Sequence, residues 1–233
     1  MEESKHHSDF LAAVKYSIPV LLGYLAIGIA FGLLMADAGY PWWLSMVMSA
    51  VMYAGAGQFI AVGLFAAGTT LWEAALVQLV VNARHIAYGF SMLNQYSNTG
   101  PNKFYLIFGM TDETFALLSS MPEAGNQNRT KFMFFVTIMN HFYWIAGSVT
   151  GAAIGALIPF STQGIGFALT ALFIVLLVEQ ILRVRKPGVF IVSAIAAVLG
   201  VFLLPSRMSM LAAMVLALAL SSFLGKKERR VSS

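Results

Sequence analysis

The chain has 233 residues, of which 59% are hydrophobic and only 10% are charged. Since a soluble domain carries about 25% charged residues, this composition excludes an ordinary soluble protein. The absence of cysteine excludes disulfides and thiolate metal sites. A net charge of +4 would favour a nucleic-acid partner in a soluble protein. Here we assign it to cytoplasmic loops, so we expect membrane lipids and no nucleic acid as partners.

The first apolar run follows a polar N-terminal stretch. Residues 1–13 mix acidic and basic side chains and lack the basic-then-apolar order of a signal peptide, so we expect a cytoplasmic N-terminal segment. Runs long enough to cross a bilayer, about 20 residues, then recur up to a basic cytoplasmic tail at 225–233. The sequence predicts an all-α polytopic transmembrane protein, a single domain over residues 1–233, with about eight hydrophobic segments: 14–36, 42–67, 70–96, 103–121, 131–158, 165–182, 187–204 and 207–224.

The basic residues orient these segments, because Lys and Arg concentrate in cytoplasmic loops. With a cytoplasmic N-terminus, the outer loops hold only Lys103 and Arg207, and Arg84 lies within a segment. The other basic residues all fall on the inner side: Lys5, Lys15, Arg129, Lys131, Arg183, Arg185, Lys186, Lys226, Lys227, Arg229 and Arg230. We therefore expect a multi-pass protein of the cytoplasmic (inner) membrane with both termini in the cytoplasm.

Two segments are unusually long and rich in glycine. In 131–158 the glycines have the four-residue spacing that lets helices pack closely, and we favour that interpretation: Gly147, Gly151 and Gly155. In 42–67, the stretch YAGAGQF gathers four candidate pathway residues: Tyr53, Gly55, Gly57 and Gln58. A local break of the helix and tight packing are equally good interpretations there. A broken helix exposes backbone groups, which a membrane tolerates only beside protein or a water-filled cavity.

A faint internal repeat relates these two segments. Both run from aromatic residues into spaced glycines, from Tyr53 in one and from Tyr143 and Trp144 in the other. If the first three segments correspond to the next three, the odd number of spans makes the two units inverted. Transporters use that arrangement, with the substrate at the membrane midplane.

Polar residues inside apolar segments mark candidate sites, because a charge in a span costs at least about 2.5–3.5 kcal/mol. In 70–96, the spacing of Gln78, Asn82 and His85 places them on one helix face, which we expect to line a polar pathway. Arg84 points away from that face. It either snorkels to the outer interface or pairs with a carboxylate of a neighbouring segment.

The carboxylates follow in the stretch TDET. Asp112 and Glu113 project about 100° apart on a helix, so both cannot face lipid cheaply. We expect one of them to pair with Arg84 or with a basic residue of an inner loop, as a structural ion pair or in charge coupling, and the other to face a pathway.

Two further groups complete the candidates. Asn140 and His141 are either hydrogen-bonded core residues or pathway residues, and His141 would form a proton relay with His85. Glu179 precedes Arg183 by four residues, a spacing typical of a helix ion pair, and is a second candidate for charge coupling. The chain has no metal-ligand spacing, P-loop or nucleophile motif, so we expect no metal, no cofactor and no enzymatic activity.

Four stretches in order resemble the AzlC family, the large subunit of branched-chain amino acid exporters: YAGAGQF, LVVNARHIAYGFSML, TDETFAL and GFALTALFIVLLVEQ. The resemblance covers residues 14–187. It implies export of hydrophobic amino acids such as leucine, isoleucine and valine, with a small hydrophobic partner subunit of the AzlD type. We expect an ion or proton gradient to drive export and no ATPase to take part. One departure is Gly166, where many relatives carry an acidic residue, which bears on how transport is coupled to an ion.

These observations lead to one hypothesis for the site. Half-helix amides at Gly55–Gly57 would hold the substrate carboxylate, because the helix dipole favours anions there. The substrate ammonium group would meet Asp112, Glu113 or Gln58. The alternatives to an exporter are a channel, a carrier for another small solute, and a structural subunit of a membrane complex.

Overall fold

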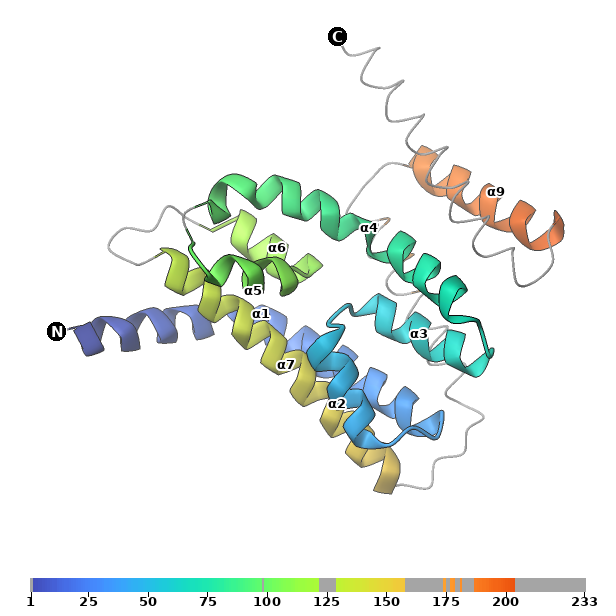
Figure 1. The fold of residues 1–233 in the computed structure, drawn as a ribbon, viewed down its shortest axis with the longest axis horizontal. Coiled ribbons are helices and arrows are strands. Elements are labelled where there is room, and N and C mark those ends of the chain that lie inside the picture. Colours follow the sequence, from blue (N-terminus) through green and yellow to red (C-terminus); the bar gives the residue numbers. More distant parts are fainter. Residues whose placement is uncertain are drawn as a thin grey trace, which may run out of the picture. The chain divides into compact units, whose positions relative to one another are not determined.

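The computed structural model describes residues 2–97, 99–121, 129–157 and 187–203, together with residues 174, 177, 178 and 181. Within this part of the chain, the regular elements are all α-helices (Figure 1), which confirms the all-α prediction. They are α1 (Glu2–Asp37), α2 (Trp42–Val51), α3 (Ala56–Ala66), α4 (Leu71–Tyr96), α5 (Asn102–Phe108), α6 (Asp112–Ser119), α7 (Arg129–Leu157) and α9 (Pro187–Leu203).

The chain divides into two compact units. One consists of Met1–Thr69 and Val81–Ile165, and the other consists of Thr70–Val80 and Gly166–Ser233. The first unit contains α1, α2, α3, α5, α6, α7 and most of α4, whereas the start of α4 and α9 belong to the second. The single transmembrane domain stays a prediction.

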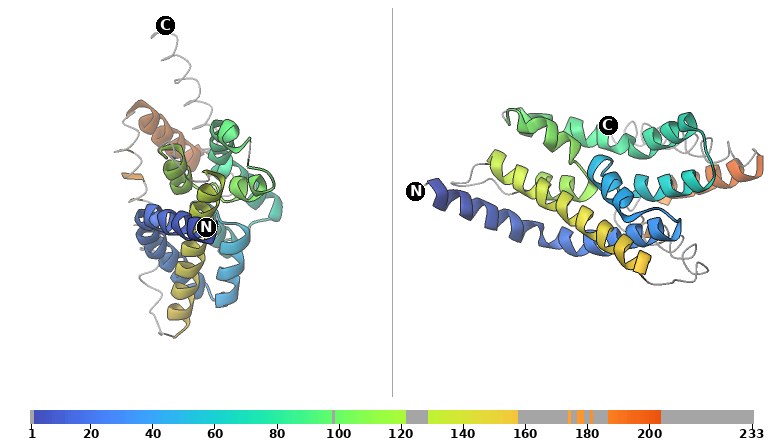
Figure 2. Two further views of the ribbon diagram at one scale, coloured as in Figure 1. Left: turned by 90° about the vertical axis from the view of Figure 1, so that its left-hand side faces the viewer. Right: turned by 60° about the horizontal axis from the view of Figure 1, so that its bottom comes forward.

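The two longest helices, α1 and α7, lie side by side and run in the same direction (Figure 2). Their contact is made backbone to backbone. A Cβ atom on Gly28 would lie 3.1 Å from the Ser148 nitrogen, and one on Gly147 would lie 2.9 Å from a carbonyl oxygen of α1. Gly32 and Gly151 approach the backbone of the other helix more closely still. Close packing by the glycines of α7 is therefore confirmed.

Both long helices are apolar and long enough to cross a membrane, α1 over Phe10–Asp37 and α7 over Arg129–Leu157. Helix α1 already begins at Glu2, so the described part of the predicted N-terminal segment 1–13 is helical and continuous with the first span. Large apolar side chains are exposed on the first unit, as expected for surfaces that contact lipid or another membrane protein: Phe90, Phe104 and Phe142.

Segment 42–67 is broken into α2 and α3. Helix α2 ends at Val51 and α3 begins at Ala56. Between them, Tyr53 and Gly55 have positive φ angles of 41° and 37°. Glycine tolerates this region, but it is strained for a bulky aromatic residue. Of the two interpretations of YAGAGQF, the helix break is the one observed.

Segment 103–121 is broken as well. Helix α5 ends at Phe108 and α6 begins at Asp112, a break that the sequence did not indicate. A Cβ atom on Gly109 would collide with the methyl group of Thr137 on α7. Glycine therefore lets this second break lie directly against α7.

The internal repeat stays a prediction, because segment 165–182 lies mostly outside the described residues and 207–224 lies wholly outside them. The two segments that suggested the repeat differ in the structure, since 42–67 is broken and 131–158 is one continuous helix. Segment 187–204 corresponds to α9 of the second unit.

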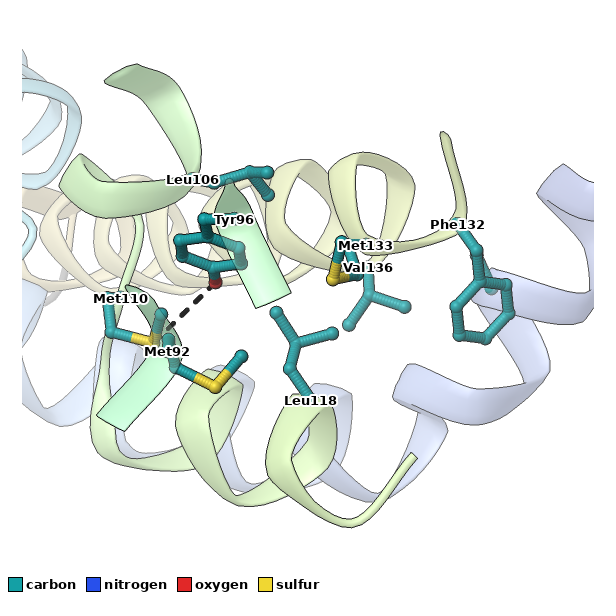
Figure 3. Packing of buried hydrophobic residues seen from close by; sticks show 9 residues of the cluster. Met92, Tyr96, Leu106, Met110, Leu118, Phe132, Met133 and Val136 are labelled. Carbon is teal, nitrogen blue, oxygen red and sulfur yellow. Dashed lines mark hydrogen bonds between the residues drawn. The ribbon is translucent and has the colours of Figure 1, made fainter. Parts of the chain in front are cut away.

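An apolar cluster joins α1, α4, α5, α6 and the first half of α7 (Figure 3). Methionine is prominent in it, and Met92, Met133 and Tyr96 are each only 1% exposed. The Tyr96 hydroxyl lies 3.9 Å from the sulfur of Met110. Because methionine is unbranched, it fills irregular gaps of this kind. The cluster packs the short helices against the long pair beside the second break.

Candidate functional site

One short stretch of α7 connects both broken segments. Trp144 Nε1 donates to Gln58 Oε1 of α3 at 2.8 Å, and Asn140 Nδ2 donates to the Thr114 hydroxyl of α6 at 3.0 Å. Between these two residues, His141 contacts α2 and α5. All three α7 side chains are buried. The two helix breaks are therefore held on the same face of α7, with each half-helix bonded to it.

His141 uses both ring nitrogens as a bridge. Nε2 lies 3.1 Å from the Ser49 carbonyl oxygen of α2, and Nδ1 lies 2.8 Å from the Tyr105 hydroxyl of α5. A carbonyl oxygen only accepts, so Nε2 carries the proton and Nδ1 of the neutral ring accepts from Tyr105. The ring also stacks on Tyr53, with centroids 4.2 Å apart. This geometry makes His141 a brace between the two breaks.

Gln58 is a brace within the first break. Its Oε1 accepts from the Ala54 amide at 3.2 Å and from Trp144 at 2.8 Å, and its Nε2 donates to the Ser49 hydroxyl at 3.2 Å. The Gly57 amide is bonded to the Ala54 carbonyl at 2.7 Å. The Gly57 amide and both ends of the Gln58 side chain therefore already have partners, and carboxylate binding at Gly55–Gly57 stays a prediction.

We expect Gln58→Ala to lower the free energy of unfolding by about 1–3 kcal/mol, because the buried donors of Ala54 and Trp144 lose their acceptor. Thermal unfolding of the purified protein in detergent measures the change. Ser91→Ala is the control, since this exposed hydroxyl bonds only its own helix. An equal shift in the two variants would contradict the bracing role.

A chain of hydroxyl groups runs from Glu113 into the protein. Tyr24 of α1 donates to Glu113 Oε2 at 2.8 Å and lies 2.6 Å from the Thr111 hydroxyl. Thr111 donates at 3.0 Å to Thr114, whose oxygen also accepts from Asn140. Glu113 is exposed, whereas the other four residues are buried. The chain therefore links an accessible carboxylate at the second break with the buried face of α7.

Two buried polar atoms beside this chain have no hydrogen-bond partner within the described residues: the Tyr53 hydroxyl and Asn140 Oδ1. The Tyr53 hydroxyl is close to Tyr24 and Thr114 but does not reach hydrogen-bond geometry with either. Buried polar groups are nearly always bonded in folded proteins. These two atoms therefore indicate where a ligand or a water molecule would complete the bonding.

Arg84 pairs with Asp112, one of the two carboxylates expected for it. Arg84 Nη1 lies 2.5 Å from Asp112 Oδ2, and the two side chains are 35% and 24% exposed. Tyr88 donates to the other carboxylate oxygen, Oδ1, at 2.7 Å. The ion pair ties α4 to α6, which confirms the predicted pairing of segment 70–96 with the next segment.

The remaining residues predicted for the site are Gln78, Asn82, His85 and Glu179. His85 Nδ1 lies 3.0 Å from the Asn82 carbonyl oxygen of its own helix. His141 is bonded to α2 and α5, so the described contacts do not support a relay between the two histidines. Gln78 belongs to the second unit and is not placed relative to this site. Glu179 lies outside the described residues.

Sequence reasoning missed several residues of the site, among them Tyr24, Tyr105, Thr111, Thr114 and Trp144. A signal for the two threonines was present, because Thr followed by acidic residues is typical of a helix start. The Thr111 hydroxyl indeed caps α6 by accepting from the Thr114 amide at 3.2 Å. The three aromatic residues stand in apolar runs without a local signal. Among the described residues, no three His, Asp or Glu side chains are grouped closely enough to hold a metal ion.

Known proteins are similar to this chain over most of its length. The AzlC protein family model matches residues 19–158. The branched-chain amino acid transport protein AzlC of Bacillus subtilis is 40% identical over 79% of this chain and 73% of its own length. A membrane protein of Helicobacter pylori (strain J99) is 44% identical over 75% of this chain and 78% of its own length. The inner membrane protein YgaZ of Escherichia coli is 31% identical over 89% and 87%.

No solved structure matches the chain. The region that fits the family model contains both helix breaks, the Arg84–Asp112 ion pair and the bracing face of α7. The stretches YAGAGQF and TDETFAL, which carry part of the sequence resemblance, contribute Tyr53, Gln58 and Glu113 to the site. On this match and these relatives, the chain is a membrane protein that belongs to the AzlC family.

Proposed function

We propose that this chain exports branched-chain amino acids across the cytoplasmic membrane as the large subunit of a secondary transporter. The Bacillus subtilis relative is named a branched-chain amino acid transport protein, and the Escherichia coli relative is named an inner membrane protein. Both names agree with the composition of the chain and with its long apolar helices.

The observation that carries the proposal is the meeting of two broken helices on one face of α7. A bilayer tolerates irregular backbone only where it is covered by protein or lines a water-filled cavity. Secondary transporters use such broken helices to bind small charged substrates near the membrane midplane. An amino acid has a carboxylate, an ammonium group and an apolar side chain, and the breaks combine polar groups with aromatic walls, for example Tyr24, Tyr53 and Trp144.

The parallel course of α1 and α7 supports a cytoplasmic N-terminus. Arg129 and Lys131 stand at the start of α7, at the same end of the helix pair as Lys15 of α1. Basic residues collect on the cytoplasmic side of membrane proteins. We place that end of the pair, and the tail at 225–233, in the cytoplasm.

A small AzlD-type subunit and an ion gradient complete the proposed transporter. The exposed apolar side chains of the first unit provide surface both for lipid and for a membrane subunit. Glu113 is an accessible carboxylate beside a polar chain, which suits a residue that carries charge through the transport cycle. No ATPase is required in this scheme.

Counterflow in proteoliposomes tests the proposal. We expect vesicles with this chain and an AzlD-type subunit to exchange internal leucine or valine for labelled external substrate, with saturation and with a dependence on pH or cation. Release of preloaded leucine from cells tests the outward direction. Flux that does not saturate or exchange would indicate a channel. Exchange by the small subunit alone would leave this chain a structural role.

A further inference from the structure

Resting on the proposed function, we infer that Glu113, Asn140 and Tyr53 form the subsite for the primary ammonium group of the substrate. The three residues come from α6, α7 and the first helix break, which α7 brings together. These three side chains would distinguish an amino acid from the corresponding acid without nitrogen.

The chemistry of an ammonium group sets the requirement. It carries one positive charge and three N–H donors, so it needs a carboxylate and further oxygen acceptors. Glu113 has one oxygen bonded to Tyr24 and remains an exposed residue. The bond from Tyr24 uses only part of the acceptor capacity of the carboxylate, which can accept further N–H donors.

The other polar groups proposed for the ammonium are engaged. Asp112 has one oxygen bonded to Arg84 and the other to Tyr88. Gln58 is 0% exposed and uses both its oxygen and its nitrogen within the protein. Of these three candidates, Glu113 is the one exposed residue.

The two buried atoms without partners supply the remaining acceptors. Asn140 is 0% exposed and Tyr53 is 3% exposed, yet Asn140 Oδ1 and the Tyr53 hydroxyl make no hydrogen bond within the described residues. Both lie beside Thr114, since Asn140 Nδ2 bonds its hydroxyl and the Tyr53 hydroxyl is close to it. Thr114 in turn connects through Thr111 to the groups at Glu113.

Binding would thus satisfy two groups that have no hydrogen-bond partner within the described residues. A buried acceptor without a donor costs free energy, and an N–H of the substrate removes that cost at Asn140 Oδ1. The phenol ring of Tyr53 is held in place by stacking on His141. A substrate analogue without the ammonium group would leave both atoms unbonded and the Glu113 charge uncompensated.

The test measures selectivity rather than transport alone. The full chain with its small subunit is reconstituted, and leucine counterflow is inhibited by unlabelled leucine or by 4-methyl-2-oxopentanoate, which has the same carboxylate and alkyl group without the ammonium. In the wild type we expect leucine to inhibit at least 10-fold better. We expect Glu113→Gln to reduce this ratio of inhibition by leucine to inhibition by the oxo acid at least 10-fold. Leucine should inhibit more weakly, whereas inhibition by the oxo acid should not change.

Glu73→Gln is the matched control, because this carboxylate accepts from the amide and the hydroxyl of Thr70 at the start of its own helix, α4. Its ratio should equal that of the wild type. Tyr53→Phe removes only one hydroxyl and should reduce the ratio in the same direction, so it decides the question if Glu113→Gln does not fold. Wild-type exchange with unchanged ratios in both variants would overturn the subsite. Absence of wild-type exchange would instead overturn the proposed function.

Discussion

Replacing Gly151 by leucine should prevent the first unit from folding. A Cβ atom at this position would collide with the backbone of Ile29 on α1, and backbone cannot rotate away as a flexible side chain can. Overpacking of a core costs about 1–3 kcal/mol even where side chains give way. Here we expect a loss of about 3 kcal/mol or more. The yield of monodisperse protein and its thermal unfolding in detergent measure the effect.

Gly23→Leu is the control for that experiment. Gly23 lies on α1, the helix that Gly151 contacts, but an added Cβ atom there meets nothing within 4 Å. Leucine also favours a helix over glycine by roughly 0.8 kcal/mol. We expect Gly23→Leu to fold at least as well as the wild type. Equal losses in the two variants would show that the close approach of α1 and α7 does not stabilise the unit.

Reversing the charges of Arg84 and Asp112 together should restore much of the stability and transport that either single reversal removes. Arg84→Asp leaves two carboxylates facing each other across α4 and α6, and Asp112→Arg leaves two guanidinium groups. An unpaired charge in a span costs about 2.5–3.5 kcal/mol on insertion scales. Because both side chains are partly exposed, we expect each single reversal to cost about 2 kcal/mol.

A double-mutant cycle on unfolding free energy and leucine counterflow measures the coupling between the two residues. Tyr88→Phe removes the other hydrogen bond to Asp112 and shows how much of the effect comes from that bond. A double reversal as damaging as the sum of the single changes would mean that the ion pair does not lock α4 to α6.

The sequence by itself determined the class of the protein and several local features. Composition and long apolar runs established the membrane class, because lipid permits few unpaired charges in a span. The spacing of Gly147 and Gly151 predicted close helix packing. For the stretch around Gly55, the sequence left a helix break and tight packing as equal interpretations, and the break is observed. The isolated charge of Arg84 left two alternatives, a position at the interface or a pair with a carboxylate, and the structure shows the pair with Asp112. Each of these features follows from the spacing or cost of a few residues.

The site itself was decided by tertiary structure. Gln58 and Trp144 are 86 positions apart, and Tyr24 and Glu113 are 89 apart. Nothing local distinguishes Tyr24 or Trp144 from other aromatic residues in an apolar helix. The sequence also left the two adjacent carboxylates of TDET equivalent. The packing of α6 separates them, because Asp112 meets Arg84 while Glu113 meets Tyr24.

The second helix break likewise depends on tertiary structure more than on local sequence. Gly109 lies in an apolar run that looks like an ordinary span, and Thr111 is a good helix cap only once the chain turns there. The turn is held by the close approach of Gly109 to Thr137 on α7, a contact between residues far apart in sequence. Spacing and composition therefore specify the membrane class and the apolar segments. Contacts between distant helices specify where they break and which polar groups face each other there.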